Sequence, residues 1–136
     1  MDEGTREEIR LLLSHSHDDL ETAELLLTAG KFRACISRSY YAMFYAATAA
    51  LLSQGIRRSK HSGIQAALHQ FLIQPGLVEP EYGAFFDDAR SERELSDYDL
   101  GFVPLRPLAQ TRLLHARQFV TRMEAFLKQE VDDECC

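Results

Sequence analysis

Apolar residues recur at three- and four-residue spacing in four long segments of this chain, and glycine or proline separates each segment from the next. Such spacing places apolar side chains on one face of an α-helix. The separators are residues that end helices: Gly30, Gly55, Pro75-Gly76, and the pair Gly101 and Pro104. Nowhere does an alternating apolar and polar stretch run long enough to predict a sheet. The pattern therefore predicts an all-α fold.

Four of the predicted helices are long and one is short. The first follows a possible cap at Thr5, and the second covers residues 32 to 53, whose alanines let another helix approach closely. A short helix is expected from about His61 to Ile73, the fourth from Pro80, and the last after Pro104. Long helices joined by short connections predict an antiparallel up-and-down four-helix bundle with one short accessory helix. We expect a single helical domain over residues 5–128 and an acidic, flexible tail over residues 129–136.

Composition limits the class of protein further. The chain has 136 residues, of which 46% are hydrophobic and 26% charged, and this fits one domain with one core. It has no apolar run of membrane-spanning length and no basic, signal-like start, so we expect a cytoplasmic protein. Cys35 lies in an apolar segment and is expected in the core, whereas Cys135 and Cys136 are expected to be free thiols. Because no metal-ligand spacing or phosphate-loop motif is present, the sequence predicts no metal and no cofactor.

Charge is distributed unevenly along the chain. Residues 31–78 contain six bases and no acid, while residues 1–30 and residues 79–102 each carry a net charge of −6. A basic segment of this length can present a positive field to a phosphate. Equally, it can pair with its acidic neighbours across the bundle. Charge alone leaves both interpretations open.

One cluster of candidate binding residues lies on the second helix and at the start of the third. Arg38 and Tyr41 are three residues apart and share a helix face, which suits a phosphate and a stacked base. Lys60 and His61 stand where backbone N–H groups at a helix start also favour an anion. Alternatively, Tyr40 and Tyr41 are aromatic residues of the core or of a dimer interface.

A second cluster lies near the end of the fourth helix. Arg93 and Asp97 are four residues apart and can form an ion pair. This pairing leaves Arg90 and Tyr98 to face outward or toward a partner. The alternative is a helix-end ion pair with little effect on stability.

Three motifs follow one another in this chain: Arg-x-Tyr-Tyr-Ala-x-Phe from Arg38, Lys-His-Ser-Gly from Lys60, and Arg-x-x-x-Asp-Tyr from Arg93. In this order they resemble the motifs of the HEPN family, the higher-eukaryote and prokaryote nucleotide-binding domains, and most closely those of its small single-domain prokaryotic branch. The resemblance covers roughly residues 5 to 128 and implies a four-helix bundle that forms a homodimer with a cleft between the subunits. Family members are commonly encoded beside minimal nucleotidyltransferases and act in toxin–antitoxin or defence systems. The implied partners are a nucleotide or RNA, a second copy and a separately encoded nucleotidyltransferase, with no membrane.

Many HEPN toxins are metal-independent endoribonucleases that use an arginine followed, four to six residues later, by a histidine. This chain holds Asp97 and Tyr98 in the matching region, and a carboxylate is a poor substitute for an imidazole. The sequence therefore favours a protein that binds nucleotide or RNA over an enzyme.

Two alternatives stay open. The first is an endoribonuclease that uses Arg93 with Asp97, Tyr98 or His61, provided that the bundle or a dimer cleft brings His61 to Arg93. The second is a pure interaction module without nucleotide affinity. Tyr98 also resembles the tyrosine that a partner nucleotidyltransferase modifies with AMP in some systems of this family.

Overall fold

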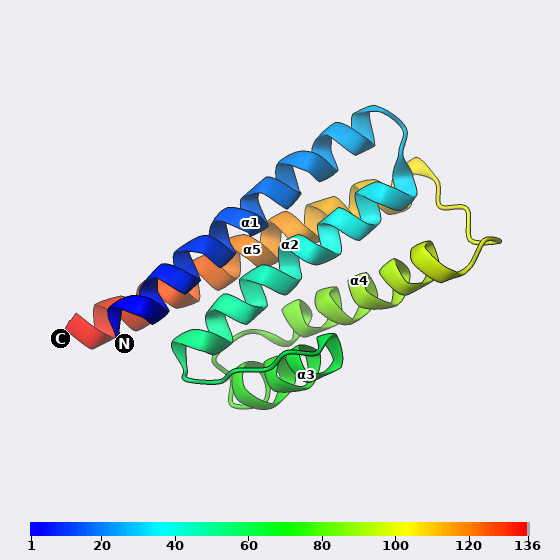
Figure 1. Cartoon of the computed structure of the whole chain (residues 1–136). Helices are drawn as coiled ribbons and strands as arrows, with labels where there is room; N and C mark the ends of the chain where they lie inside the picture. The colour runs from blue at the N-terminus through cyan, green and yellow to red at the C-terminus, as the bar shows by residue number, and fades with distance from the viewer. Residues whose placement is uncertain (136) are drawn as a thin grey trace.

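The computed structural model describes residues 1–135, with side chains through Val131, as a set of helices joined by short connections (Figure 1). No β-strand occurs within residues 1–135, so the predicted all-α class is confirmed. In chain order the elements are α1 (Glu3–Thr28), α2 (Phe32–Ser53), α3 (His61–Ala67), the π-helix η1 (Leu68–Ile73), α4 (Pro80–Tyr98) and α5 (Arg106–Cys135).

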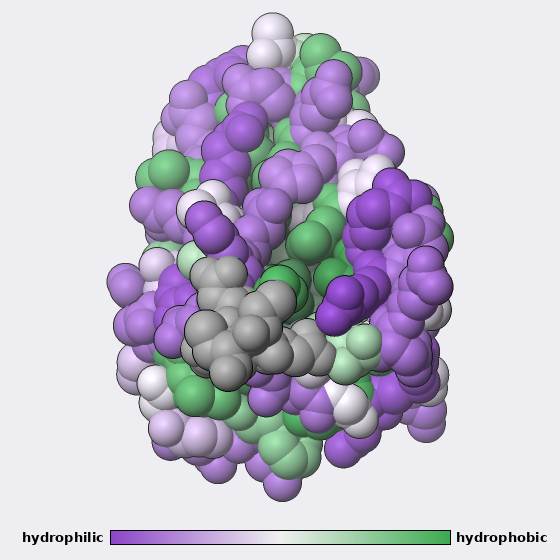
Figure 2. All heavy atoms as spheres, turned by 90° about the vertical axis from the view of Figure 1, so that its left-hand side faces the viewer, coloured by the Kyte–Doolittle hydropathy of each residue, from purple (hydrophilic) through white to green (hydrophobic). Residues whose placement is uncertain are grey.

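The four long helices lie side by side, and α3 with η1 packs near one end of α2 and α4 (Figure 1). α2 occupies the centre of the bundle because it contacts α1, α4 and α5. Both termini lie at the same end. The surface at that end is mostly hydrophilic, with apolar side chains in a hollow between the helices (Figure 2). This arrangement is the predicted four-helix bundle with an accessory helix.

Small side chains allow α2 to approach its neighbours closely. Alanines at 42, 46, 47, 49 and 50 are completely buried. At the crossing with α1, the hydroxyl of Ser16 donates a hydrogen bond of 2.7 Å to the carbonyl oxygen of Ala42. Larger side chains fill the remaining core, among them the fully buried Ile36, Met43 and Phe86. Complete burial of one such side chain stabilises the fold by about 1.5–3 kcal/mol.

Local chain chemistry explains most helix ends. Gly30 and Gly55 adopt positive φ angles of 76° and 75° just after α1 and α2, as helix-ending glycines do. The cap of α1 differs from the prediction: Asp2, not Thr5, caps this helix, and its carboxylate accepts a 2.7 Å hydrogen bond from the Thr5 backbone N–H. The expected single accessory helix is divided into α3 and η1.

The last helix continues past residue 128, where the sequence places the end of the domain. Residues 129–135 are therefore helical, and Cys136 lies outside the described residues. The flexibility expected of this segment stays a prediction. Cys35 is buried, as expected of a core residue. None of the described helices combines the length and apolar composition needed to cross a membrane.

Arg33 of α2 fixes the connection between α4 and α5. Its guanidinium donates hydrogen bonds to the carbonyl oxygens of Ser96, Asp99 and Phe102. A short turn follows, in which the Asp99 carboxylate accepts a 2.9 Å bond from the backbone N–H of Gly101. Because the accepting carbonyl groups lie in the last turn of α4, at its C-cap and in the connection that follows, both the end of α4 and this connection are held against α2.

Candidate functional site

The two clusters expected from the sequence meet where α2, α3 and α4 come together. α2 supplies a cation and aromatic rings, α3 supplies an imidazole from its first residue, and α4 supplies two further cations and a carboxylate. We refer to this group as the α2–α4 cluster, and it consists of Arg38, Tyr40, Tyr41, Phe44, His61, Arg90, Arg93 and Asp97.

Arg38 and Tyr41 form the predicted pair of a cation and a ring. The Arg38 Cζ atom lies 4.6 Å from the centroid of the Tyr41 ring. Arg38 Nη1 also lies 3.1 Å from a carboxylate oxygen of Asp19 on α1. Burial raises the pKa of the Asp19 carboxyl group, while the Arg38 charge opposes that rise. Arg38 is therefore partly neutralised by an acidic neighbour, as the second interpretation of the basic segment predicts.

His61 is held between aromatic rings and a hydroxyl group. Its Nδ1 atom shares a 2.7 Å hydrogen bond with the hydroxyl of Tyr40. The imidazole stacks on Phe44 with ring centroids 4.3 Å apart. Partial burial, together with the positive charges of Arg93 and Arg90, lowers the pKa of the His61 imidazole. His61 is therefore mainly uncharged at neutral pH.

Arg93 is one of the few charged residues that the protein buries. Only 8% of the residue is exposed, and its Cζ atom lies 5.1 Å from the centroid of the Tyr40 ring. Nη1 donates a 3.0 Å hydrogen bond to Asp97, which confirms the predicted ion pair. Nε is buried and has no hydrogen-bond partner among the described residues. Because Arg93 and His61 both contact Tyr40, the fold brings these two residues to the same place.

Arg90 corrects one expectation. The sequence predicts that it faces outward or toward a partner, but it is half-buried and donates a hydrogen bond to the side-chain oxygen of Gln65 on α3. The reason is that Arg90 lies one turn before Arg93 on the side of α4 that α3 covers. Gln65 in turn donates a 2.6 Å hydrogen bond to Asp87. Sequence reasoning missed Gln65, although its position one turn after His61 places it on the same helix face.

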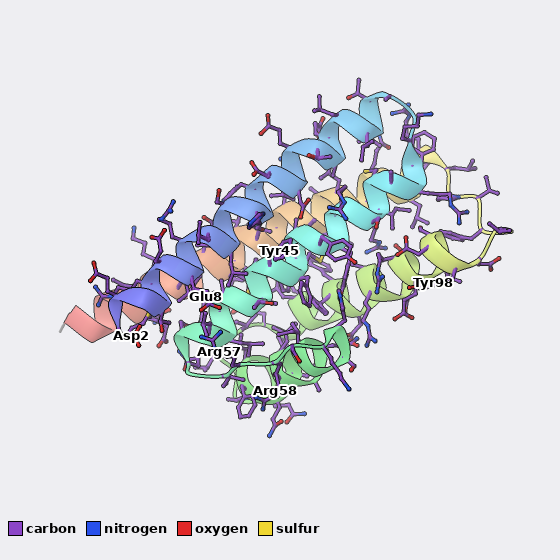
Figure 3. All side chains as sticks on the ribbon, in the orientation of Figure 1. Asp2, Glu8, Tyr45, Arg57, Arg58 and Tyr98 are labelled. Atoms are coloured by element: carbon purple, nitrogen blue, oxygen red, sulfur yellow. The ribbon has the colours of Figure 1, made fainter. Side chains whose placement is uncertain are left out.

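Lys60 and Tyr98 lie at the edges of the cluster. Lys60 is exposed immediately before α3, and Tyr98 is 79% exposed at the end of α4, facing outward as expected (Figure 3). Two further exposed bases, Arg57 and Arg58, lie in the connection between α2 and α3 (Figure 3). Arg57 forms an ion pair of 2.8 Å with Glu8 of α1. The basic segment thus forms ion pairs with α1 and also presents positively charged side chains at the surface.

This arrangement suits an anion that carries an aromatic group. Guanidinium groups form strong hydrogen bonds with phosphate oxygens, and half-buried rings offer surfaces for a stacked base. An uncharged imidazole beside them can accept a proton at one ring nitrogen and donate a hydrogen bond from the other. Within the part of the chain that the structure describes, no group of three or more histidine, cysteine, aspartate or glutamate residues is placed to hold a metal ion.

Comparison with known proteins gives one family and several relatives. The model of the HEPN domain matches residues 9–131. A protein of Methanocaldococcus jannaschii named "Putative toxin" is 28% identical over 129 residues, which cover 95% of this chain and 96% of the relative. A second "Putative toxin" of that organism is 26% identical over 122 residues, covering 90% and 83%. A UPF0332 protein of Pyrococcus horikoshii is 38% identical over 90 residues, covering 66% and 63%.

Proposed function

Because this chain belongs to the HEPN domain family, we propose that it binds a nucleotide or RNA through the α2–α4 cluster. In this proposal it acts in the cytoplasm as a homodimer, together with a separately encoded minimal nucleotidyltransferase in a toxin–antitoxin or defence system. The two relatives named "Putative toxin" support the toxin-like role. The homodimer and the nucleotidyltransferase rest on the resemblance to the family.

The observation that carries the proposal is that Arg93 is buried while its charge and its hydrogen bonds are only partly satisfied by the protein. Burial of a guanidinium group costs free energy unless its N–H groups are hydrogen-bonded and its charge is compensated. Asp97 compensates the charge from one side, but Nε has no partner among the described residues. A phosphate bound beside the exposed part of the guanidinium would add a negative charge and acceptor oxygens for its other N–H groups. The ligand would thus complete a charge compensation that the partly exposed Asp97 provides only in part.

The surroundings of Arg93 favour RNA over a single nucleotide. The half-buried rings of Tyr41 and Tyr45 lie on the same helix, with centroids 6.3 Å apart. Beyond them, the exposed bases Arg57, Arg58 and Lys60 follow the connection to α3. Aromatic rings beside a row of positively charged side chains are typical of surfaces that bind single-stranded nucleic acid.

A titration tests this proposal. A fluorescent single-stranded RNA and a fluorescent ATP analogue are each titrated with the wild-type protein and with the Arg93→Ala and Lys60→Ala variants. We expect Arg93→Ala to weaken binding about tenfold or more, because a hydrogen bond to a charged group contributes about 1.5–3 kcal/mol. Lys60→Ala should weaken binding less, since an exposed lysine contributes only a screened charge.

Arg117→Ala is the matched control, because Arg117 is exposed on α5 and pairs with Glu24 of α1 at 2.8 Å, away from the cluster. It should leave the affinity unchanged, and all variants should keep the helical circular dichroism of the wild type. Unchanged affinity in both Arg93→Ala and Lys60→Ala would refute the proposed site. A wild-type protein that binds neither RNA nor nucleotide would favour the pure interaction module.

The meeting of His61 and Arg93 at Tyr40 favours a second candidate, a metal-independent endoribonuclease. In such a reaction the RNA 2′-oxygen attacks the adjacent phosphorus and the 5′-oxygen leaves, so one proton is removed and another is supplied. An uncharged His61 can accept the proton of the 2′-hydroxyl only through the ring nitrogen that carries no hydrogen, and Arg93 can stabilise the charge on the phosphorus oxygens. Cleavage of RNA in EDTA that Arg93→Ala and His61→Gln both abolish would support this candidate. Intact RNA after prolonged incubation with the wild type would refute it.

A further inference from the structure

The hydroxyl of Tyr40 is enclosed by the protein. Tyr40 is completely buried, and burial raises the pKa of its phenol to about 12. The phenol therefore keeps its hydrogen at neutral pH. His61 Nδ1, at 2.7 Å, is the hydrogen-bond partner of this hydroxyl among the described residues.

A buried O–H group needs an acceptor, because nothing replaces the water that it leaves. An uncharged imidazole has one nitrogen that carries hydrogen and one that accepts. If Nδ1 carried the hydrogen, the Tyr40 hydroxyl would lose its acceptor. We propose that Tyr40 is a positioning residue that donates its hydroxyl hydrogen to Nδ1 of His61 and thereby keeps the imidazole hydrogen on Nε2.

The aromatic neighbours fix the plane of the same ring. Phe44 stacks on the imidazole at 4.3 Å with an interplanar angle of 23°. The Tyr40 ring stacks at 5.6 Å and 25°, and the Tyr41 ring meets it edge-on at 5.7 Å and 83°. The hydroxyl thus selects the tautomer, while the three rings restrict rotation of the imidazole.

Charged groups on α4 favour the same uncharged state. Arg93 and Arg90 both disfavour a positive charge on His61, and Glu94 opposes them more weakly. His61 then presents an N–H donor from Nε2, the nitrogen that does not face Tyr40. This donor suits a hydrogen bond to an oxygen of a phosphate. It excludes a role for Nε2 as a base, which counts against His61 as the base of the endoribonuclease candidate. That use of the donor rests on the proposed function.

Nuclear magnetic resonance of the ligand-free protein tests the role of Tyr40. Long-range proton–nitrogen correlation spectra of ¹⁵N-labelled protein distinguish the ring nitrogen that carries hydrogen from the one that does not, and the His61→Gln spectrum assigns the His61 signals. At neutral pH we expect hydrogen on Nε2 in the wild type and a mixture of both tautomers in Tyr40→Phe. Tyr41→Phe is the matched control, since Tyr41 contacts the ring without a hydrogen bond to Nδ1, and it should keep the wild-type pattern.

Hydrogen on Nδ1 in the wild type would overturn the proposal, as would a wild-type pattern in folded Tyr40→Phe. If Tyr40→Phe does not fold, the wild-type spectrum alone decides. The spectra contain no ligand, so they are independent of the proposed function. A protein that binds no RNA but carries hydrogen on Nε2 would refute that function and still support the role of Tyr40.

Discussion

Two buried arginines, Arg93 of α4 and Arg112 of α5, have their charges compensated in different ways. Arg112 of α5 is 6% exposed and forms an ion pair with the largely buried Glu92, and it also contacts His115. Arg93 is 8% exposed and shares Asp97, which is more than one-third exposed, while its Nε has no hydrogen-bond partner among the described residues. The charge of Arg112 is thus compensated by a carboxylate inside the bundle. The charge of Arg93 is compensated only in part, by a carboxylate that is partly exposed.

In the proposed function, this difference separates a structural charge, that of Arg112, from a charge that a ligand can use, that of Arg93. At the contact between α4 and α5, the Arg112 pair joins two helices and leaves little charge for an outside anion. In the α2–α4 cluster, the neighbours of Arg93 are aromatic rings and an imidazole, and its carboxylate partner Asp97 is partly exposed, unlike Glu92. Four predictions test this contrast, beginning with the largest effect.

The first prediction concerns the Glu92 pair. Glu92→Leu leaves Arg112 buried without a counter-charge, so we expect the free energy of unfolding to fall by about 3 kcal/mol or more. Urea unfolding followed by circular dichroism measures this loss. The double variant Glu92→Leu/Arg112→Met should recover most of it, because no buried charge remains. A double variant as unstable as Glu92→Leu would show that the charge on Arg112 is not the cause.

The second prediction applies the same measurement to the cluster. Arg93→Met removes a buried cation and leaves only the partly exposed Asp97 without its partner. We expect the free energy of unfolding to change by about 1 kcal/mol or less, since partly exposed ion pairs contribute that little. A loss as large as that of Glu92→Leu would mean that Arg93 is a structural residue like Arg112.

The third prediction concerns pH, because each region contains a histidine whose pKa is lowered. Burial is the main cause for both His61 and His115, and nearby arginines add to it. Below an unfolded pKa of about 6.5, the unfolded chain takes up protons that the native protein resists. Stability should therefore fall as the pH falls from about 7 through the lowered native pKa values.

Urea unfolding at several pH values measures this slope. His61→Gln and His115→Gln should each remove part of the dependence of stability on pH. This effect is expected to be smaller than those of the first two predictions. Slopes equal to that of the wild type would contradict the lowered pKa values.

The smallest expected effect is at Asp97. Asp97→Asn removes the carboxylate that competes with a phosphate for Arg93, so RNA affinity should rise by about twofold. The RNA titration measures the change. Endoribonuclease chemistry that uses Asp97 predicts the opposite, a loss of cleavage in the same variant.

Local signals in the sequence predict the helices well. The observed bounds of α2, Phe32–Ser53, agree with the expected ones, because apolar spacing and the glycines that follow are properties of neighbouring residues. The Arg93–Asp97 pair was predictable for the same reason. Even local signals have limits: Asp2 and Thr5 are both able to cap a helix, and the backbone conformation decided for Asp2.

Contacts between different helices could not be predicted from spacing. The Tyr40–His61 hydrogen bond and the Arg90–Gln65 hydrogen bond each join residues more than twenty positions apart. Their formation depends on how far each helix is rotated about its axis and shifted along it. Those two quantities are set by the packing of all side chains together, so the motif residues indicated the site without indicating its internal contacts.

The position of α2 at the centre of the bundle has a thermodynamic consequence for any ligand. One face of this helix, which includes Tyr40, is packed against the core, while Arg38 and Tyr41 beside it are partly exposed. Because the backbone beneath these side chains is already ordered, binding loses little further conformational entropy. The cluster is thus preorganised, and a larger share of the free energy of each new contact contributes to the binding affinity.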